Sequence, residues 1–162
     1  MIDIARLKHI GGLLACDEIF YPILARATPD RHIWENGHAR FPIPAERDWV
    51  GDRALRSLCG LSPLQIEHNL LIYPHGIPPH RHRRHDGVMI LKAPSPEVDL
   101  LNWERLLGNG AWDQVCNGEY LILPRDTWHG LRPLPGAKPI PLPVISVNSP
   151  PGEEDDIVYL DP

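Results

Sequence analysis

Proline is the residue that most limits what this chain can fold into. It occupies 19 of the 162 positions, more than twice its average share of about 5%. Proline has no backbone N–H and a fixed φ angle, so it is excluded from helix interiors and central strands but tolerated in turns and at strand ends. We therefore expect many short strands joined by ordered loops, and not a helical bundle.

Length, composition and charge narrow the class of protein further. A chain of 162 residues suits one domain spanning 1–162, and 43% hydrophobic residues argue against wholesale disorder. The formal net charge of −5 argues against a general nucleic-acid binder. No apolar run approaches the roughly 20 residues needed to cross a bilayer. Three widely spaced cysteines form no disulfide framework, which predicts reduced thiols and a cytoplasmic protein; they are Cys16, Cys59 and Cys116.

Residues 1–25 form an apolar N-terminal arm. Its apolar positions recur at helical spacing, and Lys8 and His9 interrupt the stretch, so we interpret it as an amphipathic segment and not as a signal peptide. The positions at this spacing are Ile4, Leu7, Ile10 and Leu14.

The best strand pattern is LQIEHNLLIY at 64–73, where alternate residues define an apolar face and a more polar face. An irregular strand pair is expected within 31–49, and 53–59 is expected to be a short helix or strand. A short helix is predicted at 97–107 from Val98, Leu101 and Leu106. Such closely spaced strands predict an all-β sandwich or barrel; the other expected strands are 87–92, 119–123, 129–132, 143–148 and 157–160.

The residues suited to chemistry are concentrated in two segments, 75–88 and 118–130. His80 and His82 are two apart, so on a strand both imidazoles point to the same face and can bind one ion. Asp86 lies four residues beyond His82, an even offset that can bring its carboxylate to the same side. His129 follows a turn that contains Pro124.

These two segments resemble the two sequence motifs of the cupin superfamily. The first motif contains a glycine, H-x-H and an acidic residue, and the second contains a glycine, a proline, a glycine or aspartate, and a histidine. The matching positions, within 64–148, are Gly76, His80, His82 and Asp86, followed by Gly118, Pro124, Asp126 and His129.

The resemblance implies a small antiparallel jelly-roll β-barrel with an N-terminal arm and one or two short helices. It implies one divalent metal ion, held by His80, His82, Asp86 and His129. Iron(II) is the leading candidate, and manganese, nickel, zinc and copper are alternatives. Cupins commonly dimerise, so a homodimer with the arm at its interface is expected. The alternative is a monomer whose arm folds back onto its own barrel.

Some residues depart from the motifs or keep two interpretations. Asp86 replaces the usual glutamate and is one methylene shorter, so the site could instead consist of three histidines, with His75 or His85 as a substitute ligand. Three neighbouring arginines form either a solvated strand edge or a clamp for a substrate anion; they are Arg81, Arg83 and Arg84.

Metal ligands from one side of a barrel leave open coordination positions, which are typical of catalytic sites. The leading hypothesis is a metal-dependent enzyme acting on a small anionic molecule by iron(II)-dependent dioxygenase chemistry. A metal-assisted isomerase or lyase is the first alternative. A non-catalytic metal- or ligand-binding protein is the second, and a metal-free epimerase with a histidine base is the third and least favoured.

Overall fold

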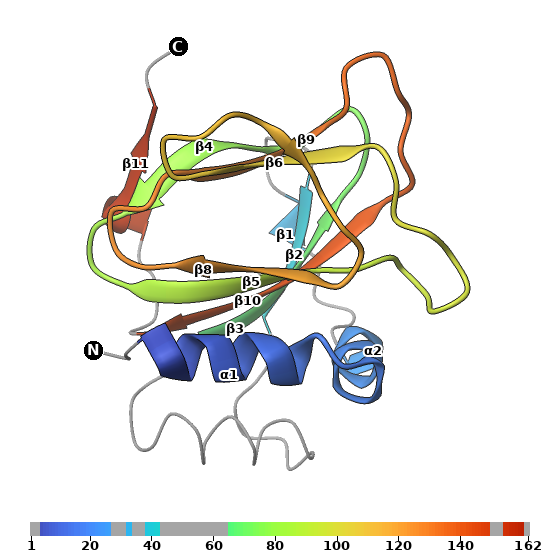
Figure 1. Cartoon of the computed structure of the whole chain (residues 1–162), viewed down its shortest axis with the longest axis horizontal. Coiled ribbons are helices and arrows are strands. Elements are labelled where there is room, and N and C mark those ends of the chain that lie inside the picture. Colours follow the sequence, from blue (N-terminus) through green and yellow to red (C-terminus); the bar gives the residue numbers. More distant parts are fainter. Residues whose placement is uncertain (1–3, 27–31, 34–37, 43–64, 150–153, 161–162) are drawn as a thin grey trace.

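The computed structural model describes residues 4–26, 32–33, 38–42, 65–149 and 154–160. Two antiparallel sheets face each other and enclose a barrel (Figure 1). The six-stranded sheet has the order β1-β2-β3-β10-β5-β8, with bounds His32–Ile33, His38–Pro42, Gln65–Leu71, Leu142–Ser149, Asp86–Leu91 and Glu119–Leu123. The five-stranded sheet has the order β11-β4-β9-β6-β7, with bounds Ile157–Tyr159, Ile77–His82, His129–Pro133, Trp103–Leu107 and Asp113–Gln114.

The all-β jelly-roll barrel expected from the sequence is confirmed. Each predicted strand from residue 64 onward appears, and 119–123 matches β8 residue for residue. From the stretch 31–49, the described strands β1 and β2 pair with each other. The expected element at 53–59 lies outside the described residues. No helix in the described part of the chain is long and apolar enough to cross a membrane.

The predicted helix at 97–107 is wrong. Residues 103–107 form β6, which pairs with β9 along its whole length. Two of the positions that suggested a helix, Val98 and Leu101, are exposed, whereas Trp103 is fully buried between the sheets. The apolar spacing was misleading because long-range strand pairing outweighs a weak local helix preference.

The N-terminal arm folds into two helices, α1 (Ile4–Leu14) and α2 (Asp17–Arg26). Figure 1 shows α1 lying across the outer face of the six-stranded sheet. A first core fills this contact and combines helix and strand residues, namely Leu7, Ile10, Leu14, Phe20, Ile23, Val88, Ile90, Ile145 and Val147. The arm therefore folds back onto its own barrel, which was the alternative to an arm at a dimer interface. The homodimer stays a prediction.

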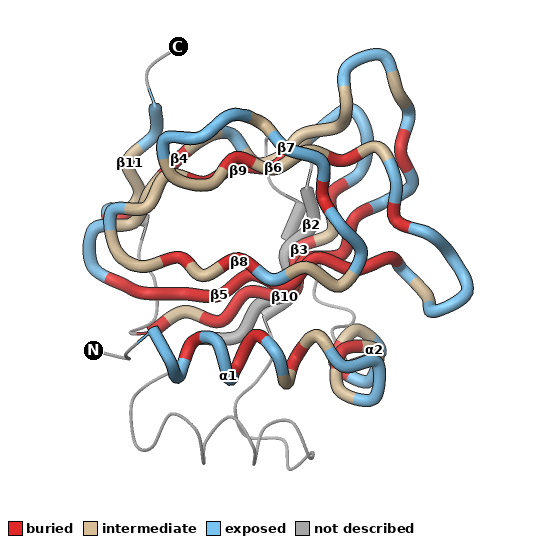
Figure 2. Tube along the Cα trace, viewed as in Figure 1, coloured by how far each residue is buried: buried red, intermediate tan, exposed pale blue. Residues whose placement is uncertain are grey.

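A second core lies between the two sheets. It includes Met89 and Leu91 from β5, Leu121 from β8 and Leu131 from β9. Strand β5 is therefore covered on both faces, and all six of its residues are buried, as the continuous red along this strand in Figure 2 shows. This explains why its sequence, DGVMIL, lacks the polar alternation of a half-exposed strand.

Lys92 connects the two helices, α1 and α2, to the barrel through polar contacts. Its ammonium group donates to the Ala15 carbonyl oxygen at 2.6 Å and forms an ion pair with Asp17. It also lies over the rings of Phe20 and Tyr21, 5.5 and 5.3 Å from their centroids. The buried ammonium is thus compensated by a carbonyl, a carboxylate and two aromatic faces.

Candidate metal centre

Three of the predicted ligands meet where β4 and β9 pair. His80 lies directly opposite His129 in the strand register, and His82 follows on the same face of β4. The ring centroids of His80 lie 4.2 Å from His129 and 4.9 Å from His82. One nitrogen from each of the three rings lies within 4.8 Å of one from each of the others. Three imidazole nitrogens thus converge on a volume that could hold one ion.

Glycine at position 130 allows this close approach of the two strands. A side-chain carbon there would lie 3.0 Å from the Ile77 carbonyl oxygen and 3.2 Å from the Pro79 backbone nitrogen. The register of the β4–β9 pair shifts between Ile77 and His80, where two prolines replace N–H donors. The irregular strand and the missing side chain together place His80 against His129.

Backbone carbonyls orient two of the three rings. His80 Nδ1 lies 2.9 Å from the Pro78 oxygen, and His129 Nδ1 lies 2.9 Å from the Thr127 oxygen. A carbonyl oxygen can only accept, so each Nδ1 carries the hydrogen and each Nε2 keeps its lone pair. This is the tautomer that a metal-binding imidazole needs, and a hydrogen bond of this kind is typical of metal-bound histidine.

Burial keeps these imidazoles neutral. Loss of solvent, reinforced by the neighbouring histidines, lowers the pKa of His82 to about 2. Burial likewise lowers the pKa of His129 to about 3, against the opposing hydrogen bond to Thr127, and lowers the pKa of His80. Neutral imidazoles are ready to bind a cation without first losing protons. The donors fit a divalent first-row metal ion.

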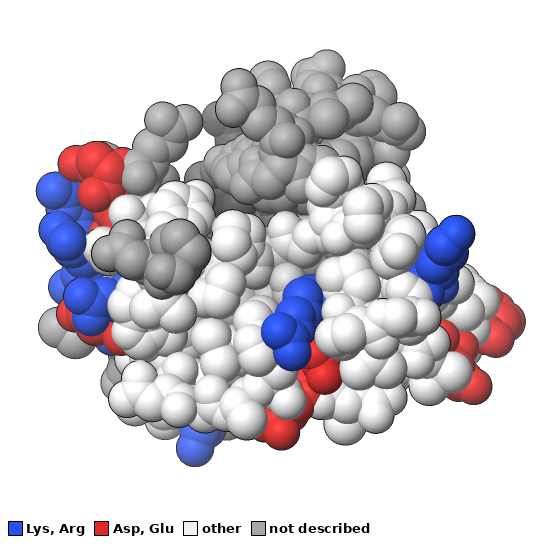
Figure 3. Space-filling model, turned by 90° about the horizontal axis from the view of Figure 1, so that it is seen from above, with Lys and Arg blue, Asp and Glu red and all other residues white. Residues whose placement is uncertain are grey.

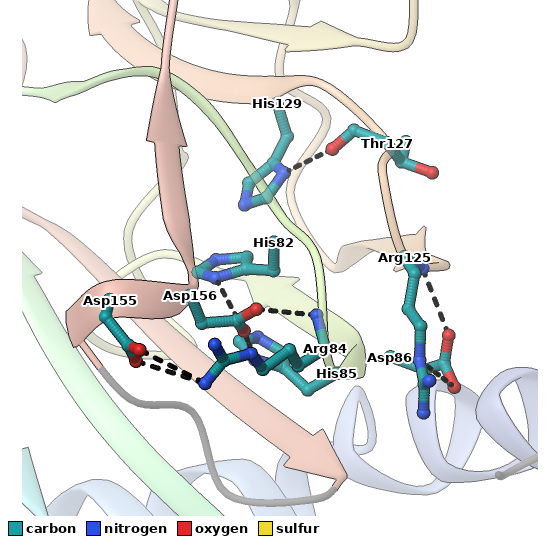
Figure 4. A network of polar contacts seen from close by, with 9 residues as sticks. All are labelled: His82, Arg84, His85, Asp86, Arg125, Thr127, His129, Asp155 and Asp156. Atoms are coloured by element: carbon teal, nitrogen blue, oxygen red, sulfur yellow. Dashed lines mark hydrogen bonds and ion pairs between the residues drawn. The ribbon is translucent and has the colours of Figure 1, made fainter.

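Asp86 is not part of this cluster. Its Oδ1 accepts a hydrogen bond from the Arg125 backbone N–H at 3.0 Å, and its Oδ2 lies 3.7 Å from Arg125 Nε. In Figure 4 this pair lies to one side, whereas His82 and His129 face each other. The structure thus brings together three of the four predicted ligands and pairs the fourth with an arginine.

Of the two substitute ligands considered from the sequence, His75 is exposed and His85 is buried beside the cluster. The ring centroids of His85 and His82 lie 3.9 Å apart, and His85 Nδ1 lies 2.6 Å from Asp156 Oδ2. Asp156 was not identified from the sequence. It lies in a run of four acidic residues, 153–156, and no motif spacing distinguishes it from its neighbours.

Two of the three arginines near the cluster, Arg81 and Arg84, are paired with acids. Arg81 Nη1 lies 3.7 Å from Asp126 Oδ1, and Arg84 Nη1 lies 3.1 Å from Asp155 Oδ2. Arg81 does not border a free strand edge, because β4 pairs with β11 on one side and β9 on the other. Seen from the side of the β4–β9–β6 sheet, the described basic and acidic side chains lie in mixed groups (Figure 3).

No known family profile matches the sequence, and no curated protein matches it significantly. Solved structures do match the fold. KdgF from Halomonas sp. shares 21% identity at a TM-score of 0.52, over 76% of this chain and 90% of its own. The polyketide cyclase RemF from Streptomyces resistomycificus shares 16% identity at a TM-score of 0.55, over 84% of this chain and 82% of its own.

A third match is a Klebsiella pneumoniae protein with a double-stranded β-helix domain. It shares 13% identity at a TM-score of 0.54, over 85% of this chain and 87% of its own. The protein is thus a two-sheet antiparallel jelly roll with a histidine cluster at a strand pair. More specifically, it has the cupin-type double-stranded β-helix fold that its sequence motifs implied.

Proposed function

We propose that this protein is a metal-dependent enzyme that acts on a small molecule, with one divalent ion held by His80, His82 and His129. The observation that carries the proposal is the convergence of three neutral imidazoles, two buried and the third, His82, partly buried, two of which have Nδ1 fixed on a backbone carbonyl. Three protein ligands leave coordination positions for substrate, the arrangement typical of catalytic sites.

The donor set favours some metals and reactions over others. Three imidazoles without a carboxylate suit zinc, iron, nickel and copper better than manganese. They add no negative charge, so the ion would keep its full charge for polarising a substrate oxygen as a Lewis acid. This favours non-redox chemistry of the isomerase, lyase or cyclase kind. The name of the RemF structure, a polyketide cyclase, describes chemistry of this kind on a similar fold.

Iron(II)-dependent oxygen chemistry is the second candidate. Imidazole is a good ligand for iron, and the open positions would also suit it. The two-histidine, one-carboxylate triad common in such enzymes is not formed, because Asp86 pairs with Arg125. The substrate is expected to be anionic in either case. Arg81 and Arg84 already contact carboxylates, so the attraction for an anionic substrate would come from the positive charge of the ion.

Replacement of the ligands tests the proposal. His82→Ala and His129→Ala are each expected to abolish stoichiometric metal binding while the barrel stays folded. His75→Ala is the matched control, because His75 is exposed and lies outside the cluster. Metal content measured on protein purified without chelator decides the question. Full occupancy in either ligand variant would show that the metal site is assigned to the wrong residues.

An oxygen-uptake screen on the purified protein separates the two reaction classes. Bound iron with oxygen consumption supports the oxygenase. Bound zinc or nickel, with substrate turnover and no oxygen consumption, supports the Lewis-acid enzyme.

A further inference from the structure

The C-terminal segment reaches the histidine cluster. Strand β11 pairs with β4, so that Ile157 lies opposite His82 and Tyr159 lies opposite His80. The short 3-10 helix Glu154–Asp156 precedes β11 and places Asp156 against the turn that follows His82. Only 1% of Asp156 is exposed to solvent. A carboxylate buried to this extent needs donors to offset its loss of hydration.

Three nitrogen atoms lie near the Asp156 carboxylate. Its Oδ1 accepts a hydrogen bond from the Arg84 backbone N–H at 2.5 Å. Its Oδ2 lies 2.6 Å from His85 Nδ1 and 3.7 Å from His82 Nδ1 (Figure 4). The Arg83 backbone N–H donates to the Asp156 carbonyl oxygen at 3.2 Å. One residue of the C-terminal segment thus binds the whole turn that follows His82.

His82 is the one ring of the cluster whose Nδ1 has no backbone carbonyl partner in the described part of the chain. His82 Nδ1, His85 Nδ1 and Asp156 Oδ2 are all buried, and none of them forms a hydrogen bond of good geometry within the described part of the chain. The same carboxylate oxygen, Asp156 Oδ2, thus faces both unsatisfied imidazole nitrogens. Asp156 Oδ2 faces His82 Nδ1 at 3.7 Å, a longer separation than the 2.9 Å of the Pro78 and Thr127 hydrogen bonds to the other two rings.

We propose that Asp156 is a positioning residue of the metal centre, which turns His82 Nδ1–H toward its carboxylate and leaves Nε2 facing His80 and His129. The inference rests on the proposed metal-binding function. A partner of this kind fixes the tautomer and ring orientation of a metal-binding histidine and makes it a better ligand. Packing of His85 against the His82 ring holds the same orientation from a second side.

A second metal ion held by His82, His85 and Asp156 would explain the grouping less well. Two ligand atoms at about 2.0–2.1 Å from one tetrahedral ion lie roughly 3.3 Å apart. The 2.6 Å between His85 Nδ1 and Asp156 Oδ2 is too short for that arrangement and suits a direct contact between ring and carboxylate.

The test compares Asp156→Asn with Asp155→Asn. Asp155 is the matched control, because it is the adjacent residue, is 65% exposed and forms its ion pair with Arg84 at the surface. Asp156→Asn is expected to weaken zinc affinity about 10–100-fold and to change the absorption spectrum of the cobalt-loaded protein. Asp155→Asn should change neither. Equal zinc affinities and identical cobalt spectra for the two variants would overturn the inference.

The tautomer of His82 in the wild-type chain provides a test that needs no variant to fold. Nitrogen-15 NMR of the zinc-loaded protein should show hydrogen on Nδ1 and metal on Nε2 for His82. Hydrogen on Nε2 would refute the role of Asp156. If the wild-type protein binds no zinc, the proposed function fails, and the same measurement on the metal-free protein still decides whether His82 Nδ1–H faces Asp156.

Discussion

His80 and His129 lie directly opposite each other across β4 and β9, and their ring centroids are 4.2 Å apart. Each residue comes from a different sequence motif, so a single cross-strand pair joins the two motifs into one site. A register slip of one residue would move every side chain of one strand to the opposite face. The histidine cluster therefore depends on the register of this strand pair as much as on the identity of its residues.

Loss of Asp86 is expected to affect stability more than metal binding. Asp86→Ala removes the acceptor for the Arg125 backbone N–H, and a buried donor left without a partner costs about 1–3 kcal/mol. Zinc affinity should fall much less than in His82→Ala. Urea unfolding of the metal-free variant and zinc titration of the folded variant measure the two effects separately. Loss of zinc binding as complete as in His82→Ala would instead identify Asp86 as a ligand.

Acid should destabilise the metal-free protein well above the range in which carboxylates titrate. Burial lowers the pKa of His82 to about 2, of His129 to about 3 and of His68 to about 4. In the unfolded chain each imidazole binds a proton near pH 6.5. The free energy of unfolding is therefore not reduced by these histidines above about pH 6.5. It decreases as the pH falls from there toward the pKa values of the folded state, because only the unfolded chain takes up the protons.

The free energy of unfolding should decrease by about 1.4 kcal/mol per pH unit for each proton taken up on unfolding. Urea unfolding at about pH 7.5, 6 and 5 measures it, with His82→Ala as the comparison, which should show a shallower slope. A free energy of unfolding that is constant over this range would contradict the burial of neutral imidazoles.

The helical layer should contribute to stability through one face only. Ile10 is fully buried in the first core, whereas Ile4 is 53% exposed on the same helix. Ile10→Ala is expected to lower the free energy of unfolding by about 2–5 kcal/mol. Ile4→Ala should stay within about 0.5 kcal/mol. Equal effects of the two substitutions in urea unfolding would mean that α1 does not pack on the sheet in solution.

Adjacent glycines in α1 provide a sharper test of the same contact. A side-chain carbon on Gly11 would lie 2.5 Å from Tyr120 Cδ2 and 2.8 Å from Cγ, but on Gly12 it would meet nothing within 4 Å. Gly12→Ala should therefore stabilise the protein by about 0.5–1 kcal/mol through helix propensity. Gly11→Ala should destabilise it, because the Tyr120 ring must move. The melting temperatures of the two variants should shift in opposite directions.

The sequence predicts those parts of the molecule whose signals are local. Alternation predicted β3, helical spacing predicted the arm, and motif spacing singled out His80, His82 and His129, which the structure brings together. The helix predicted at 97–107 was wrong, because pairing with β9 determines the structure of residues 103–107. The sequence also could not show that the Asp86 carboxylate turns to Arg125, since strand parity fixes a face and not a partner.

Asp156 could not be predicted from the sequence for a different reason. Its importance comes from contacts with Arg84 and His85, which lie 72 and 71 positions away in the chain. An acidic residue in an acidic run carries no local sign of such contacts. The strand at 157–160 was expected, but its pairing with β4, which brings Asp156 to the turn after His82, is a long-range contact that no local pattern indicates.

The pairing of β11 with β4 also has a consequence for the order in which the molecule assembles. The turn after His82 is hydrogen-bonded to Asp156, which lies 72 positions beyond Arg84. The turn therefore cannot reach its native structure until this long loop has closed. Contacts between distant segments form late and slow the folding of β proteins. The helices, built from local contacts, are expected to form early in refolding, and the cluster of His80, His82 and His129 is expected to form last.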